Sequence, residues 1–164
     1  MNPRQLAATM TTIFGELLDG PASEAYMLNR GDAGLLRSLD KLSAEQASAV
    51  AHGGASIAAH VAHLCYGLSL MNRWSAGEHP FESADWSASW RKTIVSNAEW
   101  QALRAEFAGE ARRWLTVLGD PRDVTAAEVN GMLGSIAHLA YHFGAIRQID
   151  RAARGPAELD RTGA

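Results

Sequence analysis

One stretch near the C-terminus, Ser135–Ile149, reads SIAHLAYHFGAIRQI and carries the strongest pattern in this chain. Its apolar residues recur at the three- and four-residue intervals of an α-helix. His138 and His142 are four positions apart, so on a helix they lie about 40° apart around the axis and about 6 Å apart along it. Both imidazoles can therefore face one metal ion, which would need a further ligand from a facing helix. A pair with this spacing also arises by chance on helices that bind no metal.

The composition favours one globular domain over residues 1–164. The net charge is −3 and the basic residues are scattered, which argues against a nucleic-acid partner. Cys65 is the single cysteine, so a disulfide framework is excluded and a reducing compartment is favoured. There is no secretory pattern at the N-terminus, and no apolar run approaches the roughly 20 residues of a membrane span. We therefore expect a cytoplasmic protein that is not embedded in a membrane.

Helical periodicity extends along the whole chain, and no segment alternates as a strand does. Capping-box pairs that begin with Ser43, Ser96 and Thr125 mark three helix starts. Gly131 and Gly134 are expected to kink or restart the last helix. The predicted long helices cover about residues 6–19, 56–74, 96–118 and 135–153.

A polar and aromatic connection of residues 75–95 links the second and third long helices, and it contains Trp86 and Trp90. A connection of this length is unusual in a compact domain and is often functional. The sequence therefore predicts an all-α fold, a four-helix bundle with a long crossover connection. Sites in such bundles are built from inward-facing side chains on facing helices.

The second long helix supplies two further histidines, His60 and His63. They are three positions apart, about 60° around the helix axis, so both can face the interior without reaching the same ion. Two alternatives stay open: a four-histidine site, or a three-histidine site in which His60 supports a ligand. His52 and His79 are expected to be solvated loop histidines. Leu139 stands where a metalloprotease would have its glutamate base, so that class is excluded.

The four-helix layout, the His63-Leu64 pair and the stretch HLAYHFGAIRQ over residues 138–148 resemble the DinB/YfiT-like superfamily. The resemblance extends from near Gln5 to near Ala153. It implies a divalent metal ion bound by His63, His138 and His142, with open coordination positions for water or substrate. Characterised relatives include thiol-dependent S-transferases, a mycothiol-dependent maleylpyruvate isomerase and proteins regarded as hydrolases, and homodimers are common among them.

A metal ion with three imidazoles and an open position can bind a thiol as its nucleophilic thiolate, or lower the pKa of a bound water. Neither histidine helix has a carboxylate near the site, which favours thiol chemistry over hydrolysis. We therefore expect a metal-dependent, thiol-dependent S-transferase that acts on small electrophiles, with zinc or nickel and a low-molecular-weight thiol. The alternatives are a non-catalytic metal-binding protein and a metal-activated hydrolase.

Other side chains are candidates for supporting roles. His60 is the candidate proton shuttle, and Tyr141 or Tyr66 is the candidate hydrogen-bond donor. Arg147 could bind a substrate carboxylate, with a structural ion pair as the alternative. Trp86 could line the mouth of a substrate pocket, or pack as a lid over the end of the bundle. Cys65 is expected to be an inert buried thiol.

Overall fold

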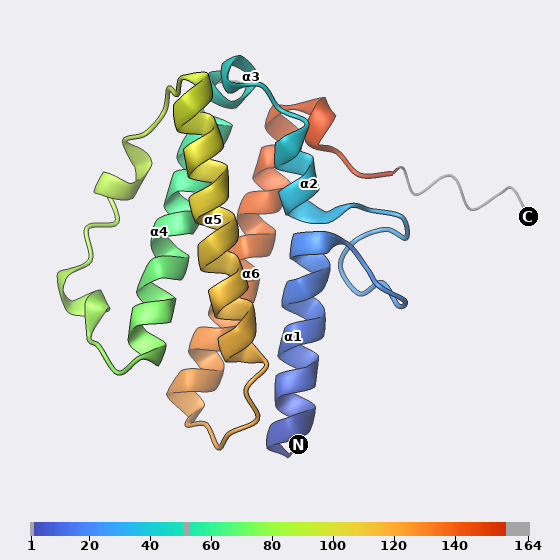
Figure 1. The fold of residues 1–164 in the computed structure, drawn as a ribbon, viewed down its shortest axis with the longest axis vertical. Coiled ribbons are helices and arrows are strands. Elements are labelled where there is room, and N and C mark those ends of the chain that lie inside the picture. Colours follow the sequence, from blue (N-terminus) through green and yellow to red (C-terminus); the bar gives the residue numbers. More distant parts are fainter. Residues whose placement is uncertain (1, 51–52, 157–164) are drawn as a thin grey trace, which may run out of the picture.

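The chain forms four long helices that run side by side: α1 (Pro3–Asp19), α4 (Ile57–Ser75), α5 (Asn97–Leu118) and α6 (Ala126–Ile149) (Figure 1). This computed structural model describes residues 2–50 and 53–156, and those ranges contain no strand. The predicted all-α class is confirmed. The expectation for His52 lies outside the described residues.

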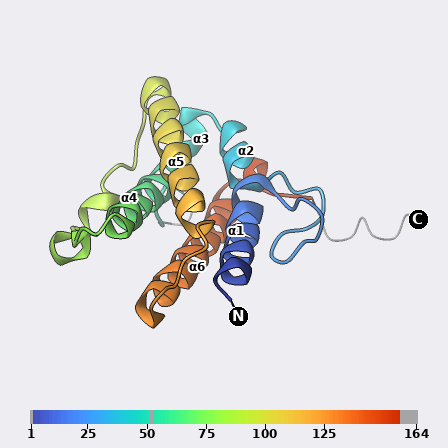
Figure 2. The same ribbon diagram turned by 60° about the horizontal axis from the view of Figure 1, so that its bottom comes forward.

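The four long helices surround one core. α4 packs against α5 and α6, and α1 packs against the same two helices. In Figure 2, α4 and α1 lie on opposite sides, with α5 and α6 between them. α4 and α5 run in the same direction because the connection between them returns along the length of the molecule (Figure 1). That connection contains two 3₁₀ turns, η1 (Pro80–Ser83) and η2 (Ala88–Trp90).

Local sequence signals explain most helix starts. The predicted capping boxes at Ser43, Ser96 and Thr125 are present and begin α3 (Ala44–Ser48), α5 and α6. In each, the side-chain oxygen accepts a backbone N–H that the first helical turn leaves unpaired. Asn2 forms a further capping box before α1. The short helix α2 (Gly34–Asp40) starts without a side-chain cap.

The predicted restart of the helix at Gly131 and Gly134 is wrong, because α6 is continuous from Ala126 to Ile149. Gly131 allows close packing, because a Cβ there would lie only 2.9 Å from the Trp74 ring. The helix also ends before the predicted residue 153. Asp150 accepts the Ala152 N–H and starts a separate 3₁₀ turn, η3 (Arg151–Ala153).

One apolar stripe along α5 forms part of the core. All six stripe residues are buried: Trp100, Leu103, Phe107, Ala111, Trp114 and Leu118. Both stripe tryptophans also pair their indole N–H, which donates to Leu42 O at 2.8 Å from Trp100 and to Ser135 Oγ at 2.8 Å from Trp114. Neither of these two indole N–H groups is left without a hydrogen-bond partner, so burying the two tryptophans carries little penalty for lost hydrogen bonds to water. Within the described ranges, no helix is long and apolar enough to cross a membrane.

Candidate metal centre

Three histidines from two helices converge at the side of the molecule covered by the connection. His63 Nε2 on α4 lies 3.0 Å from His138 Nε2 on α6. His142 Nε2, one turn further along α6, lies 2.9 Å from the same His138 nitrogen. One ligand atom from each residue lies within 4.8 Å of the others, so the group could bind a single metal ion. The predicted trio is therefore brought together.

The nitrogen spacing fits a first coordination shell. Two nitrogens that are each about 2.1 Å from an ion are about 3.0 Å apart at an octahedral right angle and about 3.4 Å apart at the tetrahedral angle of zinc. His63 and His142 are buried, and His138 is half-buried. Imidazole nitrogens suit zinc, nickel, copper and iron, whereas calcium and magnesium prefer oxygen ligands. The donor set therefore fits a transition metal ion.

The surroundings keep these imidazoles neutral, which is the form that binds a metal. Burial, helped by the nearby His138, His60 and His63, lowers the pKa of His142 to about 3. Burial, helped by His138 and then His60, lowers the pKa of His63 to about 4. Burial also lowers the pKa values of His60 and His138. At neutral pH these side chains carry no charge that would repel a cation.

The connection fixes the orientation of His63. His63 Nδ1 lies 2.7 Å from Ser89 Oγ, and the Ser89 hydroxyl donates to the Trp86 carbonyl at 2.6 Å. Since the hydroxyl proton is used in that bond, Ser89 Oγ accepts the proton on His63 Nδ1. His63 Nε2 then carries its lone pair toward the other two histidines. Ser89 was not among the residues predicted for the site, because no motif in the connection singles it out.

His60 holds the outer side of His142. The two Nδ1 atoms are 2.8 Å apart, while His142 Nε2 faces His138. A metal-ligating histidine usually donates its second ring N–H to a nearby acceptor, and His60 is in that position. This geometry favours the three-histidine alternative, with His60 as the supporting residue.

Two tryptophans of the connection cover the histidines. The Trp90 ring stacks on His63, with centroids 4.2 Å apart, and meets His60 edge-on at 5.3 Å. The Trp86 centroid lies 5.7 Å from His63 and 5.6 Å from Tyr66. These contacts place the connection over the centre, so the ligand set depends on the packing of residues 86–90.

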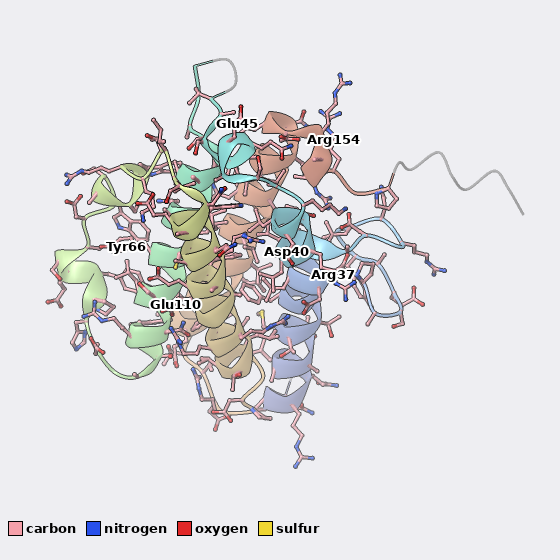
Figure 3. All side chains as sticks on the ribbon, turned by 45° about the horizontal axis from the view of Figure 1, so that its top comes forward. Arg37, Asp40, Glu45, Tyr66, Glu110 and Arg154 are labelled. Carbon is pink, nitrogen blue, oxygen red and sulfur yellow. The ribbon has the colours of Figure 1, made fainter. Side chains whose placement is uncertain are left out.

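Tyr66 attaches the connection to α4. Its hydroxyl accepts the Asp85 backbone N–H at 2.9 Å, and Figure 3 shows its side chain reaching from α4 toward the connection. Tyr141 lies on α6, next to His142 in the chain. Its ring is exposed and meets His142 edge-on, with centroids 5.0 Å apart. Of the two candidate donors, Tyr66 already has a partner and Tyr141 faces solvent.

Arg147 does not join the cluster. Its Nη2 lies 2.7 Å from each carboxylate oxygen of the buried Asp32. The guanidinium also lies over the Phe143 ring, 3.9 Å from the centroid. Arg147 therefore forms an ion pair with a protein carboxylate, which was the alternative to substrate binding. Nothing in this geometry supports the predicted role of Arg147 in binding a substrate carboxylate.

The remaining candidates lie apart from the centre. Cys65 is buried, and that burial, with the nearby Glu106 and Glu110, raises the pKa of its thiol to about 12. It is therefore a protonated, unreactive thiol at neutral pH, as expected. His79 is exposed in the connection, also as expected.

In the part of the chain that the structure describes, no carboxylate belongs to the three-histidine group. Comparison of the chain with protein-family models, curated proteins and solved structures finds no match. The chemistry of the site therefore has to be argued from its own residues.

Proposed function

We propose that His63, His138 and His142 bind one divalent transition metal ion, zinc or nickel, in a thiol-dependent S-transferase that acts on small electrophiles. The observation that carries this proposal is the convergence of three Nε2 atoms whose nearest spacings are 2.9 and 3.0 Å. Support from Ser89 and His60 on two of the outer nitrogens adds to it.

We also propose that the chain belongs to the DinB/YfiT-like superfamily. The parallel pair α4 and α5, the long connection between them and the histidines on α4 and α6 support a four-helix bundle of the DinB/YfiT-like kind. A cytoplasmic homodimer is the assembly that goes with this resemblance. These assignments are independent of the identity of the metal.

A bound ion would supply a positive charge that favours the thiolate form of a low-molecular-weight thiol. The thiol proton passes to solvent. The sulfur electron pair then forms the new S–C bond with the electrophile, and the leaving group departs with the electrons of the broken bond. His60 and Ser89 hold the ligand rings in orientation, and the Trp90 ring excludes water from one side of His63.

Transfer of a thiol fits the site better than hydrolysis. A hydrolase needs a base that takes a proton from the attacking water. The described residues place no carboxylate in the histidine group, and the Nδ1 atom of His60 is already paired with His142. A thiol ionises more readily than water and needs no dedicated base.

Metal analysis tests the site. Protein purified without chelators should contain one ion per chain. His63→Ala, His138→Ala and His142→Ala should each lose it with helical content unchanged, while the exposed-loop variant His79→Ala should keep it. Stoichiometric metal in all three ligand variants would refute the site.

Turnover tests the activity. Metal-loaded and chelator-treated protein should be compared with a panel of low-molecular-weight thiols and a chromogenic aryl halide. Metal-dependent loss of the halide supports an S-transferase. If no thiol gives metal-dependent turnover, the S-transferase proposal is refuted in favour of the non-catalytic class or a hydrolase.

A further inference from the structure

An apolar pocket of about 250 Å³ lies beside the metal centre, between α4, α6 and the connection. Side chains from all three segments line it, among them Leu64, Leu68, Met71, Phe81, Trp86 and His138. Ser135 is the one hydroxyl residue in the lining, and its oxygen already accepts from Trp114 Nε1 and donates to Met132 O. A charged group in this pocket would therefore lose hydration, with His138 as the remaining polar side chain of the lining that could contact it.

The pocket and the metal centre share residues. His138 belongs to both, and Trp86 lines the pocket while its ring lies 5.7 Å from His63. Gly67 marks the junction: a Cβ there would lie 3.5 Å from His138 Cε1 and 3.7 Å from the Trp86 ring. A group attached close to an atom bound at the centre would therefore reach the pocket.

Missing side chains create the space. Gly67, Gly131 and Gly134 all line the pocket. A Cβ on Gly134 would meet no other atom within 4 Å, so this position opens onto free space. An engineered apolar cavity of about 150 Å³ is large enough to bind benzene. The volume found here suits an aromatic ring with a short substituent.

We infer that this pocket binds the uncharged, apolar part of the substrate, a group about the size of a phenyl or benzyl ring. The inference rests on the proposed function for its connection to sulfur chemistry at the centre. Binding of an apolar group to the pocket itself does not depend on that function. The two are therefore tested separately.

The first experiment measures binding of toluene to metal-free protein by ligand-observed NMR. Gly134→Leu and Met71→Trp should fill the pocket from opposite helices and weaken binding at least tenfold. Gly144→Leu is the matched control, because Gly144 is on the same helix, also has open space, and lies outside the pocket lining. Absence of toluene binding to the unaltered chain, or equal binding by all three variants, would overturn the inference.

The second experiment compares benzyl mercaptan with 2-mercaptoethanol on cobalt-substituted protein, using the sulfur-to-cobalt absorption band. Burial of the ring should make benzyl mercaptan bind about 10- to 100-fold more tightly. Gly134→Leu should abolish the preference and retain one cobalt ion per chain. Equal affinity for the two thiols would overturn the substrate assignment. If toluene binds but neither thiol perturbs the cobalt spectrum, the proposed function is refuted, whereas the inference that the pocket binds an apolar group is retained.

Discussion

His60 and His142 face each other through their Nδ1 atoms, 2.8 Å apart, although 82 positions separate them in the chain. His142 Nε2 points the other way, toward His138 at 2.9 Å. If His142 donates its Nδ1 proton to His60, its Nε2 lone pair is directed into the three-histidine cluster. His60 thus controls which nitrogen of His142 is free to bind a metal.

Replacing His60 should weaken metal binding at the centre without abolishing it. His60→Phe keeps a buried ring but loses the acceptor for His142, so metal affinity should fall about 10- to 100-fold with a stoichiometry of one at saturation. Competition with a chromogenic chelator measures the change. His79→Phe, in an exposed loop position, should leave the affinity unchanged. Complete loss of binding in His60→Phe together with retention in His63→Ala would show that His60 is the ligand instead.

Ser89 should contribute through its contact with His63. Ser89→Ala removes the 2.7 Å hydrogen bond to His63 Nδ1, so the imidazole loses its fixed orientation and the affinity for metal should fall about tenfold. Ser83→Ala is the matched control, because Ser83 is exposed in the same connection. Equal affinities for the two variants would mean that packing under Trp90 alone orients His63.

The metal-free protein should lose stability in mild acid. Burial lowers the pKa of His63 to about 4 and that of His142 to about 3, whereas an unfolded imidazole has a pKa of about 6.5. Below pH about 6.5 the unfolded chain therefore binds protons that the folded chain does not. The free energy of unfolding should fall as the pH drops toward about 4. Above pH about 6.5, these two histidines should not make the free energy of unfolding depend on pH.

Urea unfolding with a chelator present, repeated across this pH range, measures the slope. His142→Gln should make the dependence on pH shallower because the variant has one fewer suppressed protonation site. His79→Gln should behave as the unaltered chain does. The same slope in all three proteins would contradict the assignment to buried imidazoles.

The Arg147–Asp32 ion pair should stabilise the fold without contributing to metal binding. Arg147→Met leaves a buried carboxylate without its partner, and losses of this kind cost about 3–5 kcal/mol. The half-exposed pair of Arg73 and Glu78 offers the comparison, since Arg73→Met should cost at most about 1 kcal/mol. Thermal and urea denaturation measure both. Unchanged stability in Arg147→Met would return Arg147 to consideration as a substrate-binding residue.

Glu16 should anchor the loop that follows α1. Its buried carboxylate accepts the backbone N–H groups of Tyr26, Met27 and Leu28 at 2.7–3.1 Å. Glu16→Gln keeps the shape but replaces one acceptor oxygen with a donor, so stability should fall by about 1–3 kcal/mol. Glu24→Gln removes only a solvent-exposed pair with Arg30 and should change stability by less than about 0.5 kcal/mol. Denaturant unfolding of both variants tests the difference, and equal losses would contradict an anchoring role.

Local sequence signals were sufficient for most helices and for placing His138 and His142 on one helix face, whereas His63 was assigned from the family resemblance. The starts at Ser43, Ser96 and Thr125 were predictable because capping depends on residues three positions apart. The buried stripe from Trp100 to Leu118 was predictable because helical periodicity repeats within one segment. At Gly131 the same local reasoning failed, since this glycine makes room for Trp74 on another helix.

The sequence by itself determined that the chain is helical, where most helices begin and that His138 and His142 share one helix face, because each of these depends on short-range spacing. Only the tertiary structure decided that His60 pairs with His142, that Ser89 reaches His63 and that Arg147 is occupied by Asp32. These partners lie 26 to 115 positions apart, and their contacts arise from how helices and the connection pack. No periodicity within one segment encodes a distance between two segments.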